Sequence, residues 1–216
     1  MPDDNANFRG DRLACERGGR LVFARLGFSL VAGEMLVLRG ANGSGKSTLL
    51  RVMAGLTPVL SGDIRWGAGA IQADRLAHNS RCHYLGHQDA LKPVLTVRQN
   101  LQLWQSLRNG APERIDLALE QLGIARLADL PARLLSAGQR RRLALARLVA
   151  IAAPLWLLDE PATALDADGA DRLDGVLRDH LAGGGRVVLS SHGEVAGSSR
   201  ILDLMEFRPS AQDLAA

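Results

Sequence analysis

The segment Gly40–Thr48, GANGSGKST, constrains the fold of this chain more than any other segment. A short apolar run, Met35–Arg39, precedes it, and apolar residues at helical spacing follow over Lys46–Gly55. Glycines allow the loop between them to turn so that its backbone N–H groups point inward at an anion, and the following helix adds its positive end. The order of strand, glycine-rich loop and helix therefore predicts a phosphate-binding loop (P-loop) of the pattern GxxxxGK[ST].

In a P-loop the lysine reaches the β- and γ-phosphates of a nucleotide and the next hydroxyl binds Mg²⁺, which assigns these roles to Lys46 and Ser47. Of the 26 basic residues only Lys46 and Lys92 are lysines, so a lysine at this position carries weight. A glycine-rich turn that binds no ligand is the alternative, and the flanking strand and helix disfavour it. The residues expected to contact the nucleotide are Gly40, Ala41, Asn42, Gly43, Ser44, Gly45, Lys46, Ser47 and Thr48.

Two carboxylates follow a second apolar run, Leu155–Leu158. Such a run is typical of a strand buried in a parallel sheet, so Asp159 is expected at its carboxyl end, beside the P-loop, where it can hold Mg²⁺ directly or through water. Glu160 lies one residue further and points elsewhere, so it is the candidate general base for an attacking water. An apolar run that ends in Asp-Glu is common by itself, but the long separation from Lys46 leaves room for the crossover connections that such a core requires.

Strands alternate with helices along most of the chain, which is typical of an α/β sheet. The expected strands are Leu21–Val31, Met35–Arg39, Ile64–Trp66, Cys82–His87, Leu155–Leu158 and Arg186–Ser190. The expected helices include Lys46–Gly55 and Asp166–Leu181, and residues 67–81 are expected to be a loop. Between about residues 96 and 150 the helical spacing continues without strands, so this stretch predicts an inserted helical subdomain.

Composition excludes several classes of protein. With 216 residues, 47% of them hydrophobic and 23% charged, the chain is not disordered, a disulfide-stapled miniprotein or a collagen-like fibre. The best apolar stretch, Leu148–Leu158, is too short for a membrane span and contains Pro154, and Met1–Arg12 lacks the pattern of a secretory signal. The isolated cysteines Cys15 and Cys82 form no CxxC pair, which excludes the usual zinc spacing and favours a reducing compartment.

A third motif, Leu135–Gln139 (LSAGQ), precedes Asp159 and is followed by an arginine-rich helical segment. Ser136 and Gly138 open this predicted helix, where a hydroxyl and backbone amides form a second anion site. Two anion sites with only one P-loop predict a head-to-tail dimer, in which each copy completes the γ-phosphate site of the other. A simple helix cap is the alternative.

The sequence LSAGQ resembles the LSGGQ signature of ABC-type ATPases, with alanine at the third position. Further elements of that family follow in order, because Gln88 matches the Q-loop, Ala164–Asp166 matches the D-loop and His192 matches the switch histidine that contacts the γ-phosphate. The resemblance covers residues 12–205 and implies ATP and Mg²⁺ as cofactors.

The resemblance also implies the fold and the roles of individual residues. The implied fold is an α/β P-loop NTPase (RecA-like) core with an antiparallel β subdomain and an inserted helical subdomain. The core would span about 1–95 and 151–216, and the helical subdomain about 96–150. The implied catalytic residues are Glu160, Lys46, His192 and Gln88, the Mg²⁺ ligands are Ser47, Gln88 and Asp159, and the nucleotide contacts outside the P-loop are Ser136, Gly138, Gln139 and Asp166.

The sequence departs from the family where the adenine base binds. The family places an aromatic residue well before the P-loop to stack on the base, and the segment Cys15–Arg20 contains none. The planar guanidinium of Arg17 is the candidate to replace it, because arginine stacks on aromatic faces.

Further residues resemble the CcmA family, the ATP-binding export proteins of cytochrome c biogenesis. They are Cys15–Arg17, Leu85–Gln88, Leu91–Lys92, Leu95–Thr96, Asn100–Leu101 and the alanine-containing signature with its helix over Leu135–Leu148. This family implies ATP hydrolysis coupled to haem export, or to release of a haem-loaded CcmE-like chaperone, by a peripheral subunit at the cytoplasmic face of the inner membrane. The implied partners are a second copy of the chain, an integral membrane subunit (CcmB-like) and a larger complex with CcmC- and CcmD-like proteins.

Three other functions stay open at this point. The chain could be the ATPase subunit of a different ABC exporter, a soluble ABC ATPase acting on nucleic acid, or a nucleotide sensor without catalysis. A net charge of +3 and 4% aromatic residues disfavour a nucleic-acid partner, because such partners require clustered basic residues and stacking platforms. Glu160 and His192 argue against a purely sensing role.

The histidines outside these motifs suggest ordinary packing more than ligand binding. Cys82, His83 and His87 invite a haem or metal site, but on one strand His83 and His87 would share a face and Cys82 would face the other way. His78 is expected to be solvated. The segment Gln88–Leu95 is the candidate surface for coupling to a partner, because it begins at the expected γ-phosphate sensor.

Overall fold

The computed structural model describes residues 7–108, 113–191, 199–210 and 213 of the chain. The chain divides into two compact units. Unit 1 comprises Met1–Tyr84, Pro154–Asp159 and Leu181–Ala216, and unit 2 comprises Leu85–Ala153 and Glu160–His180.

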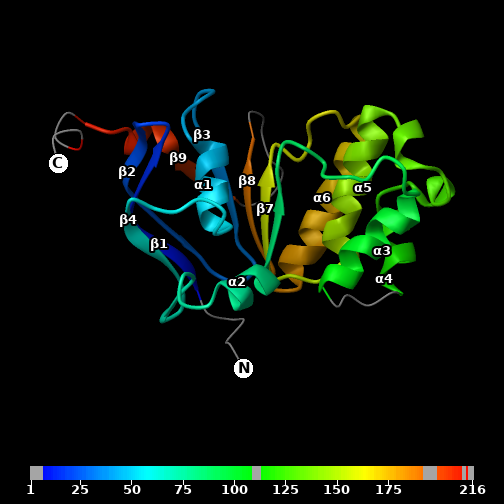
Figure 1. Ribbon diagram of the computed structural model, residues 1–216, viewed down its shortest axis with the longest axis horizontal. Coiled ribbons are helices and arrows are strands. Elements are labelled where there is room, and N and C mark those ends of the chain that lie inside the picture. The colour runs from blue at the N-terminus through cyan, green and yellow to red at the C-terminus, as the bar shows by residue number, and fades with distance from the viewer. Residues whose placement is uncertain (1–6, 109–112, 192–198, 211–212, 214–216) are drawn as a thin grey trace. The chain divides into compact units, whose positions relative to one another are not determined.

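Strands belong mainly to unit 1 and helices mainly to unit 2 (Figure 1). The strands are β1 (Phe8–Arg17), β2 (Arg20–Leu30), β3 (Met35–Arg39), β4 (Ser61–Trp66), β5 (Gly69–Ala70), β6 (Cys82–Leu85), β7 (Leu155–Asp159), β8 (Arg186–Ser190) and β9 (Arg200–Asp203). The helices are α1 (Lys46–Met53), α2 (Arg75–Arg81), α3 (Val97–Arg108), α4 (Arg114–Gln121), α5 (Ala137–Ala150) and α6 (Ala167–Ala182), with short 3₁₀ turns η1 (Ala125–Leu127), η2 (Ala132–Leu134) and η3 (Leu204–Phe207). None of these helices combines the length and the apolar character that crossing a membrane would require.

The first sheet of unit 1 is antiparallel and has the strand order β2-β1-β4-β5. β1 and β2 form a hairpin that runs from the pair Phe8–Leu30 to the pair Arg17–Arg20 and turns at Gly18-Gly19. β4 pairs with the other edge of β1. The resemblance to ABC-type ATPases implied an antiparallel β subdomain, and this sheet has that pairing.

The second sheet has the order β6-β7-β8-β3-β9, and the pairs β7–β8, β8–β3 and β3–β9 are parallel. Leu38 of β3 and Asp159 of β7 both lie opposite Ser190 of β8. Because these parallel strands end at one edge, the P-loop that follows β3 lies at the same edge as Asp159. Open α/β sheets bind their ligands beyond the carboxyl ends of their strands, so this edge is where a nucleotide is expected.

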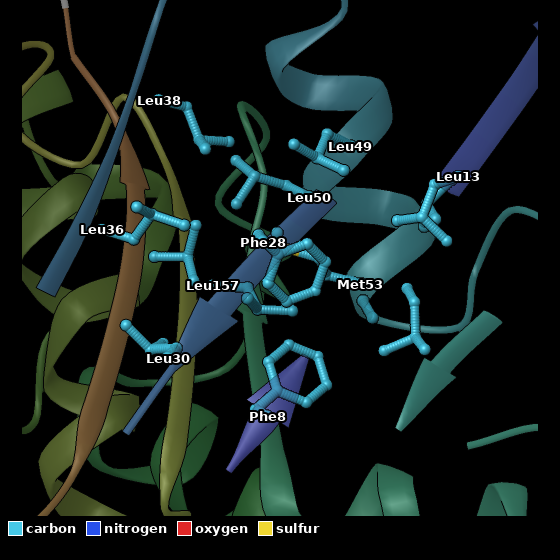
Figure 2. Close-up of a cluster of buried hydrophobic side chains, with 14 of the residues drawn as sticks. Phe8, Leu13, Phe28, Leu30, Leu36, Leu38, Leu49, Leu50, Met53 and Leu157 are labelled. Atoms are coloured by element: carbon cyan, nitrogen blue, oxygen red, sulfur yellow. The ribbon is translucent and has the colours of Figure 1, made fainter. Parts of the chain in front are cut away.

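Helix α1 lies in the core that both sheets of unit 1 share. Leu49, Leu50 and Met53 are completely buried, and Figure 2 shows them among Phe28 of β2 and Leu157 of β7. Burial of each such side chain contributes about 1.5–3 kcal/mol. The position of α1, and therefore of the P-loop at its N-terminus, is set by apolar packing.

Helix α5 is the central helix of unit 2, since every residue from Arg141 to Ala150 is buried and both α3 and α4 pack against it. Asn100 of α3 is 1% exposed and fixes the segment that follows Gln88. Its amide nitrogen donates to the carbonyls of Lys92, Leu95 and Thr96 (2.9–3.2 Å), and its Oδ1 accepts from the Lys92 N–H (2.8 Å).

Two expectations for residues 67–87 were wrong. Residues 67–81, expected to be a loop, contain β5 and α2. The carboxylate of Asp74 caps α2 by accepting from the N–H of Ala77 (2.9 Å). The helix was missed because its short polar sequence has no apolar residues at helical spacing. The expected strand over 82–87 ends at Leu85, so His87 shares no strand face with His83.

His78 of α2 is also not solvated, because it is 3% exposed in the core. Trp66 Nε1 donates to its Nδ1 (3.2 Å), and its Nε2 lies 2.9 Å from the carbonyl oxygen of Met53. An indole N–H only donates and a carbonyl only accepts, so these contacts require the neutral ring with its proton on Nε2. Burial lowers the pKa of His78, and the positive charge of Arg81 acts in the same direction, against the Met53 carbonyl.

We expect the folded protein to lose stability as the pH falls below about 6.5, the ordinary pKa of histidine. The unfolded chain binds a proton at His78 that the folded chain resists, so the contribution of the neutral ring is complete above that pH and declines below it. The melting temperature of His78→Gln should therefore decrease less between about pH 7 and pH 5 than that of the wild type. The exposed His87→Gln is the control and should follow the wild type, and equal pH dependence in all three proteins would contradict the assignment.

Candidate functional site

The P-loop joins the end of β3 to the start of α1 through left-handed glycines. The φ angles are 139° at Gly40, 78° at Gly43 and 104° at Gly45. A Cβ at Gly45 would lie 2.6 Å from Cγ1 of Val22, so no larger residue fits there without displacement. Gly45 also provides no side-chain cap for α1, which leaves the first amides of the helix available to an anion.

Two polar groups are held inside this loop. Lys46 is 6% exposed, and its Nζ donates to the carbonyl oxygens of Gly40 (2.7 Å) and Ala41 (3.3 Å). The hydroxyl of Ser44 is buried and has no hydrogen-bond partner in the part of the chain that the structure describes. The hydroxyl-bearing Ser47 is exposed. A cation, an unsatisfied hydroxyl and free helix amides together fit the phosphates of a nucleotide.

Asp159 ends β7 as a buried carboxylate, 5% exposed. The hydroxyl of Ser190 at the end of β8 donates to its Oδ1 (2.7 Å) and orients it. Burial raises the pKa of Tyr84 on β6, and the negative charge of Asp159 adds to this effect. Neither Ser190 nor Tyr84 was predicted as a site residue, because each lies outside the recognised motifs. The apolar strand that ends in Ser190 is the signal that could have identified that residue.

Glu160 stands at a sharp turn of the backbone. Its φ is 47°, an uncommon conformation for a residue other than glycine. The hydroxyl of Thr163 donates to its Oε2 (3.4 Å), and the Thr163 N–H donates to its backbone oxygen (3.1 Å). That oxygen also accepts from Nη2 of Arg141 on α5 (2.8 Å). Arg141, which the sequence motifs left without a role, is therefore part of the surroundings of Glu160.

Ser136 caps α5 in a reciprocal capping box. Its hydroxyl oxygen accepts from the N–H of Gln139 (3.2 Å), and Oε1 of Gln139 accepts from the N–H of Ser136 (2.9 Å). The helix-cap alternative is therefore present in the structure. It does not remove the anion-binding one, because a hydroxyl that accepts one hydrogen bond can still donate its own proton. Ser136, Gly138 and Gln139 line an open hollow together with Ala164 and Asp166.

The predicted D-loop lies against α5 within unit 2. A Cβ at Gly138 would come within 2.9 Å of the carbonyl oxygen of Ala164, so the glycine permits this close approach. Arg142 donates to Asp166 Oδ1 and to Asp168 Oδ2 (2.7 Å). The hydrogen bond from Arg142 lowers the pKa of Asp166, and the Gly169 N–H adds to the effect, so this carboxylate stays ionised.

The other predicted residues have the following positions. Gln88 is exposed in the bend between Gly86 and Asp89, directly after β6. Arg17 is exposed at the end of β1, and its stacking on adenine stays a prediction. His192 lies outside the described residues.

The three residues considered for a metal or haem site near β6 differ in their surroundings. Cys82 and His83 are both buried in β6, whereas His87 is exposed beyond its end. Within the described ranges, no cluster of three or more His, Cys, Asp or Glu side chains is arranged to hold a metal ion.

Comparison with known proteins places this chain in a family. The family described as "ABC transporter" matches residues 23–163, which is more than half of the chain. A protein of Paramagnetospirillum magneticum named "Cytochrome c biogenesis ATP-binding export protein CcmA" is 54% identical over 195 residues, 88% of this chain and 90% of the relative. A protein of the same name from Rhodospirillum rubrum is 47% identical over 97% of this chain and 90% of that one. The chain belongs to the CcmA family of ABC transporter proteins.

A solved structure agrees with the fold expected of the CcmA family. A putative ABC transporter ATP-binding protein from Pyrococcus furiosus superimposes with a TM-score of 0.83 over 94% of this chain and 100% of its own. At 23% sequence identity this likeness concerns the fold alone. It confirms the α/β P-loop class that the sequence predicted. As a member of the CcmA family, the chain is an ABC-type ATPase that binds a nucleotide.

The contact between the signature and the D-loop of this CcmA-family chain can be tested by one pair of glycine substitutions. Gly138→Ala should destabilise the protein by about 1–3 kcal/mol, because its Cβ would press on the backbone oxygen of Ala164. Gly175→Ala on α6 is the matched control, since its Cβ would find Nη2 of Arg178 at 4.0 Å, an ordinary contact. There the better helix propensity of alanine should stabilise by about 0.5–1 kcal/mol. Urea unfolding measures the free energy of unfolding of both variants. A change of the same sign in both would refute the close approach.

Proposed function

We propose that this protein is the ATP-hydrolysing subunit of a transporter-type complex for cytochrome c biogenesis, coupling ATP binding and hydrolysis to haem export or to release of a haem-loaded chaperone. The observation that carries the proposal is the 54% identity to a protein named for cytochrome c biogenesis and export, over nine-tenths of that protein's length. Identity over 88% of the chain supports a shared task more strongly than the P-loop does, because many unrelated activities use a P-loop.

The P-loop binds the phosphates of ATP in this proposal. Lys46 exchanges its contacts with the loop carbonyls for the β- and γ-phosphates, and the amides that begin α1 together with Ser44 bind the remaining oxygens. Ser47 and Asp159 would hold Mg²⁺, which fits their oxygen ligands, because Mg²⁺ is commonly bound by one or two protein oxygens plus substrate phosphates. Mg²⁺ when bound neutralises charge that develops on the transferring phosphoryl group.

Glu160 orients the attacking water and accepts its proton as general base. Gln88 and His192 are proposed to contact the γ-phosphate, so that both respond to its loss after hydrolysis. Arg17 is proposed to stack on the adenine base. These assignments rest on the motifs to which the residues belong and on the exposed positions of Gln88 and Arg17.

Two copies of the chain are proposed to bind head to tail, each signature completing the ATP site of the other. The hollow lined by Ser136, Gly138 and Gln139 supports this proposal, because it offers hydrogen-bond donors to an anion. Each chain has only one P-loop, so a second copy would supply the nucleotide to this hollow. Asp166 borders the same hollow. Because the γ-phosphate joins both copies, its loss weakens the dimer, and ATP hydrolysis becomes a change of population between closed and open forms.

The proposed partner is an integral membrane subunit of the CcmB type, within a complex that also holds CcmC- and CcmD-like proteins and acts on a CcmE-like haem chaperone. The subunit would then be peripheral, at the cytoplasmic face of the inner membrane. The segment from Gln88 to Leu95 is the proposed contact with that partner, since Asn100 holds its second half rigidly.

Lys46→Ala should weaken ATP binding and lower the rate of phosphate release by about 10²–10³-fold, because an electrostatic contact to the transferring group is lost. Lys92→Ala removes the other lysine of the chain, an exposed one, and should leave ATP binding unchanged. Titration with a fluorescent ATP analogue and a phosphate-release assay measure both effects. A wild-type rate for Lys46→Ala would remove this residue from the mechanism.

Glu160→Gln should keep ATP affinity, slow hydrolysis by about 10²–10⁴-fold and accumulate an ATP-bound dimer. Glu120→Gln on the exposed face of α4 is the control for loss of a carboxylate. Light scattering with ATP measures the dimer, in the presence of the membrane subunit if the isolated chain stays monomeric. Rapid steady hydrolysis by Glu160→Gln would disprove its role as base.

The biological role is tested in cells that lack this protein. Wild-type protein should restore covalent haem on c-type cytochromes, detected by haem staining, and neither Lys46→Ala nor Glu160→Gln should do so at equal expression. Full restoration by both inactive variants would separate ATP hydrolysis from cytochrome c biogenesis and refute the proposed coupling.

A further inference from the structure

Arg141 of α5 is a buried cation that contacts two separate parts of the catalytic region. Arg141 is 4% exposed. Nη2 donates to the backbone oxygen of Glu160 (2.8 Å), and Nε donates to that of Pro161 (3.1 Å). Nη1 donates to the backbone oxygen of Gly86 (3.2 Å) and to Oδ1 of Asp89 (3.1 Å).

These acceptors belong to the two segments that contain Gln88 and Glu160, the predicted catalytic side chains of unit 2. Gly86 and Asp89 lie on either side of Gln88, and the other two carbonyls belong to Glu160 and to the residue after it. One planar guanidinium therefore joins the segment of the γ-phosphate sensor to the segment of the base. Arginine suits this role because its N–H donors lie in a fixed plane, whereas the ammonium of lysine is a single point on a flexible stem.

The backbone at Glu160 needs such support. A non-glycine residue with φ of 47° is strained, and strained backbone persists only where its surroundings over-determine it. Thr163 supplies one such restraint through its N–H, and Arg141 supplies another from a different element. Asp89 balances the charge of Arg141, and a buried charge that is paired and fully hydrogen-bonded can be tolerated in the interior.

We propose that Arg141 is a positioning residue for hydrolysis: it fixes the backbone of Glu160 against the Gly86–Asp89 segment and so sets the direction of the Glu160 carboxylate. The proposal rests on the assignment of Glu160 as base. A displacement of about 1 Å in a reacting group can cost about 100-fold in rate, so a side chain that touches no substrate can still control catalysis.

The first test separates catalysis from nucleotide binding. Arg141→Gln and Arg141→Lys should lower kcat by about 10–100-fold, while the Kd for ATP stays within about twofold, because the P-loop belongs to the other unit. Asp89→Asn, which keeps an acceptor but loses the charge, should lower kcat less. Arg98→Gln is the matched control: it breaks an exposed ion pair with Asp116 (2.8 Å) in the same unit and should keep the wild-type kcat.

The second test asks whether Arg141 acts through Glu160. In a Glu160→Gln background there is no base left to aim, so adding Arg141→Gln should lower the residual single-turnover rate by less than about twofold. A merely structural arginine would lower the rate by the same factor in both backgrounds and would reduce ATP affinity and melting temperature together. Arg141→Lys and Asp89→Asn keep the test decisive should Arg141→Gln fold poorly.

Two outcomes would overturn the proposal. One is a wild-type kcat in Arg141→Gln while Glu160→Gln is inactive, which leaves the proposed function standing and removes only the role of Arg141. The other is that Arg141→Gln lowers the rate by the same factor in the wild type and in Glu160→Gln. Rapid hydrolysis by Glu160→Gln alone would instead signal failure of the proposed base, so the two failures are distinguishable.

Discussion

The burial of α1 is the constraint on which the nucleotide-binding half of this protein depends. Leu49, Leu50 and Met53 anchor the helix in a core that it shares with both sheets of unit 1. The P-loop must then open at the carboxyl edge of the parallel sheet, and Leu157 of β7 packs in the same core two residues before Asp159. Apolar packing, which is non-directional and adds over many side chains, thus places the polar groups of Lys46 and Asp159.

Unit 2 is organised differently, around buried arginines on α5. Arg141 and Arg142 are 4% and 9% exposed, and their guanidinium groups are satisfied by backbone carbonyls and by the carboxylates of Asp89, Asp166 and Asp168. A buried charge is costly unless it is paired, so each arginine restricts the loops that supply its partners. Helix α5 therefore carries the proposed anion-binding turn at its start and, one turn later, the arginines that hold the segments of Glu160, Gln88 and Asp166.

One boundary between the two units lies between Asp159 and Glu160, the proposed metal ligand and the proposed base. Asp159 ends a strand of unit 1, whereas Glu160, the next residue, begins a segment of unit 2 that Arg141 and Thr163 hold. A second boundary lies between Tyr84 and Leu85, just before the segment of Gln88. The P-loop and Asp159 belong to one unit, whereas Glu160, Gln88 and the signature residues belong to the other.

The sequence by itself determined the P-loop, the acidic pair and the signature, together with strands β3 and β8 at their exact bounds, because each depends on local chemistry or on a short-range pattern. No bounded strand was predicted over β1 or β9, α2 was predicted as a loop, and His78 was predicted to be solvated. The short polar sequence of α2 has no apolar period to reveal it. The state of His78 depends on residues outside its own helix, because Trp66 and Met53 satisfy both its nitrogens and it is therefore neutral and buried. Only the tertiary structure could assign a role to Arg141, since hydrogen bonds across 19 to 55 positions leave no periodic trace in the sequence.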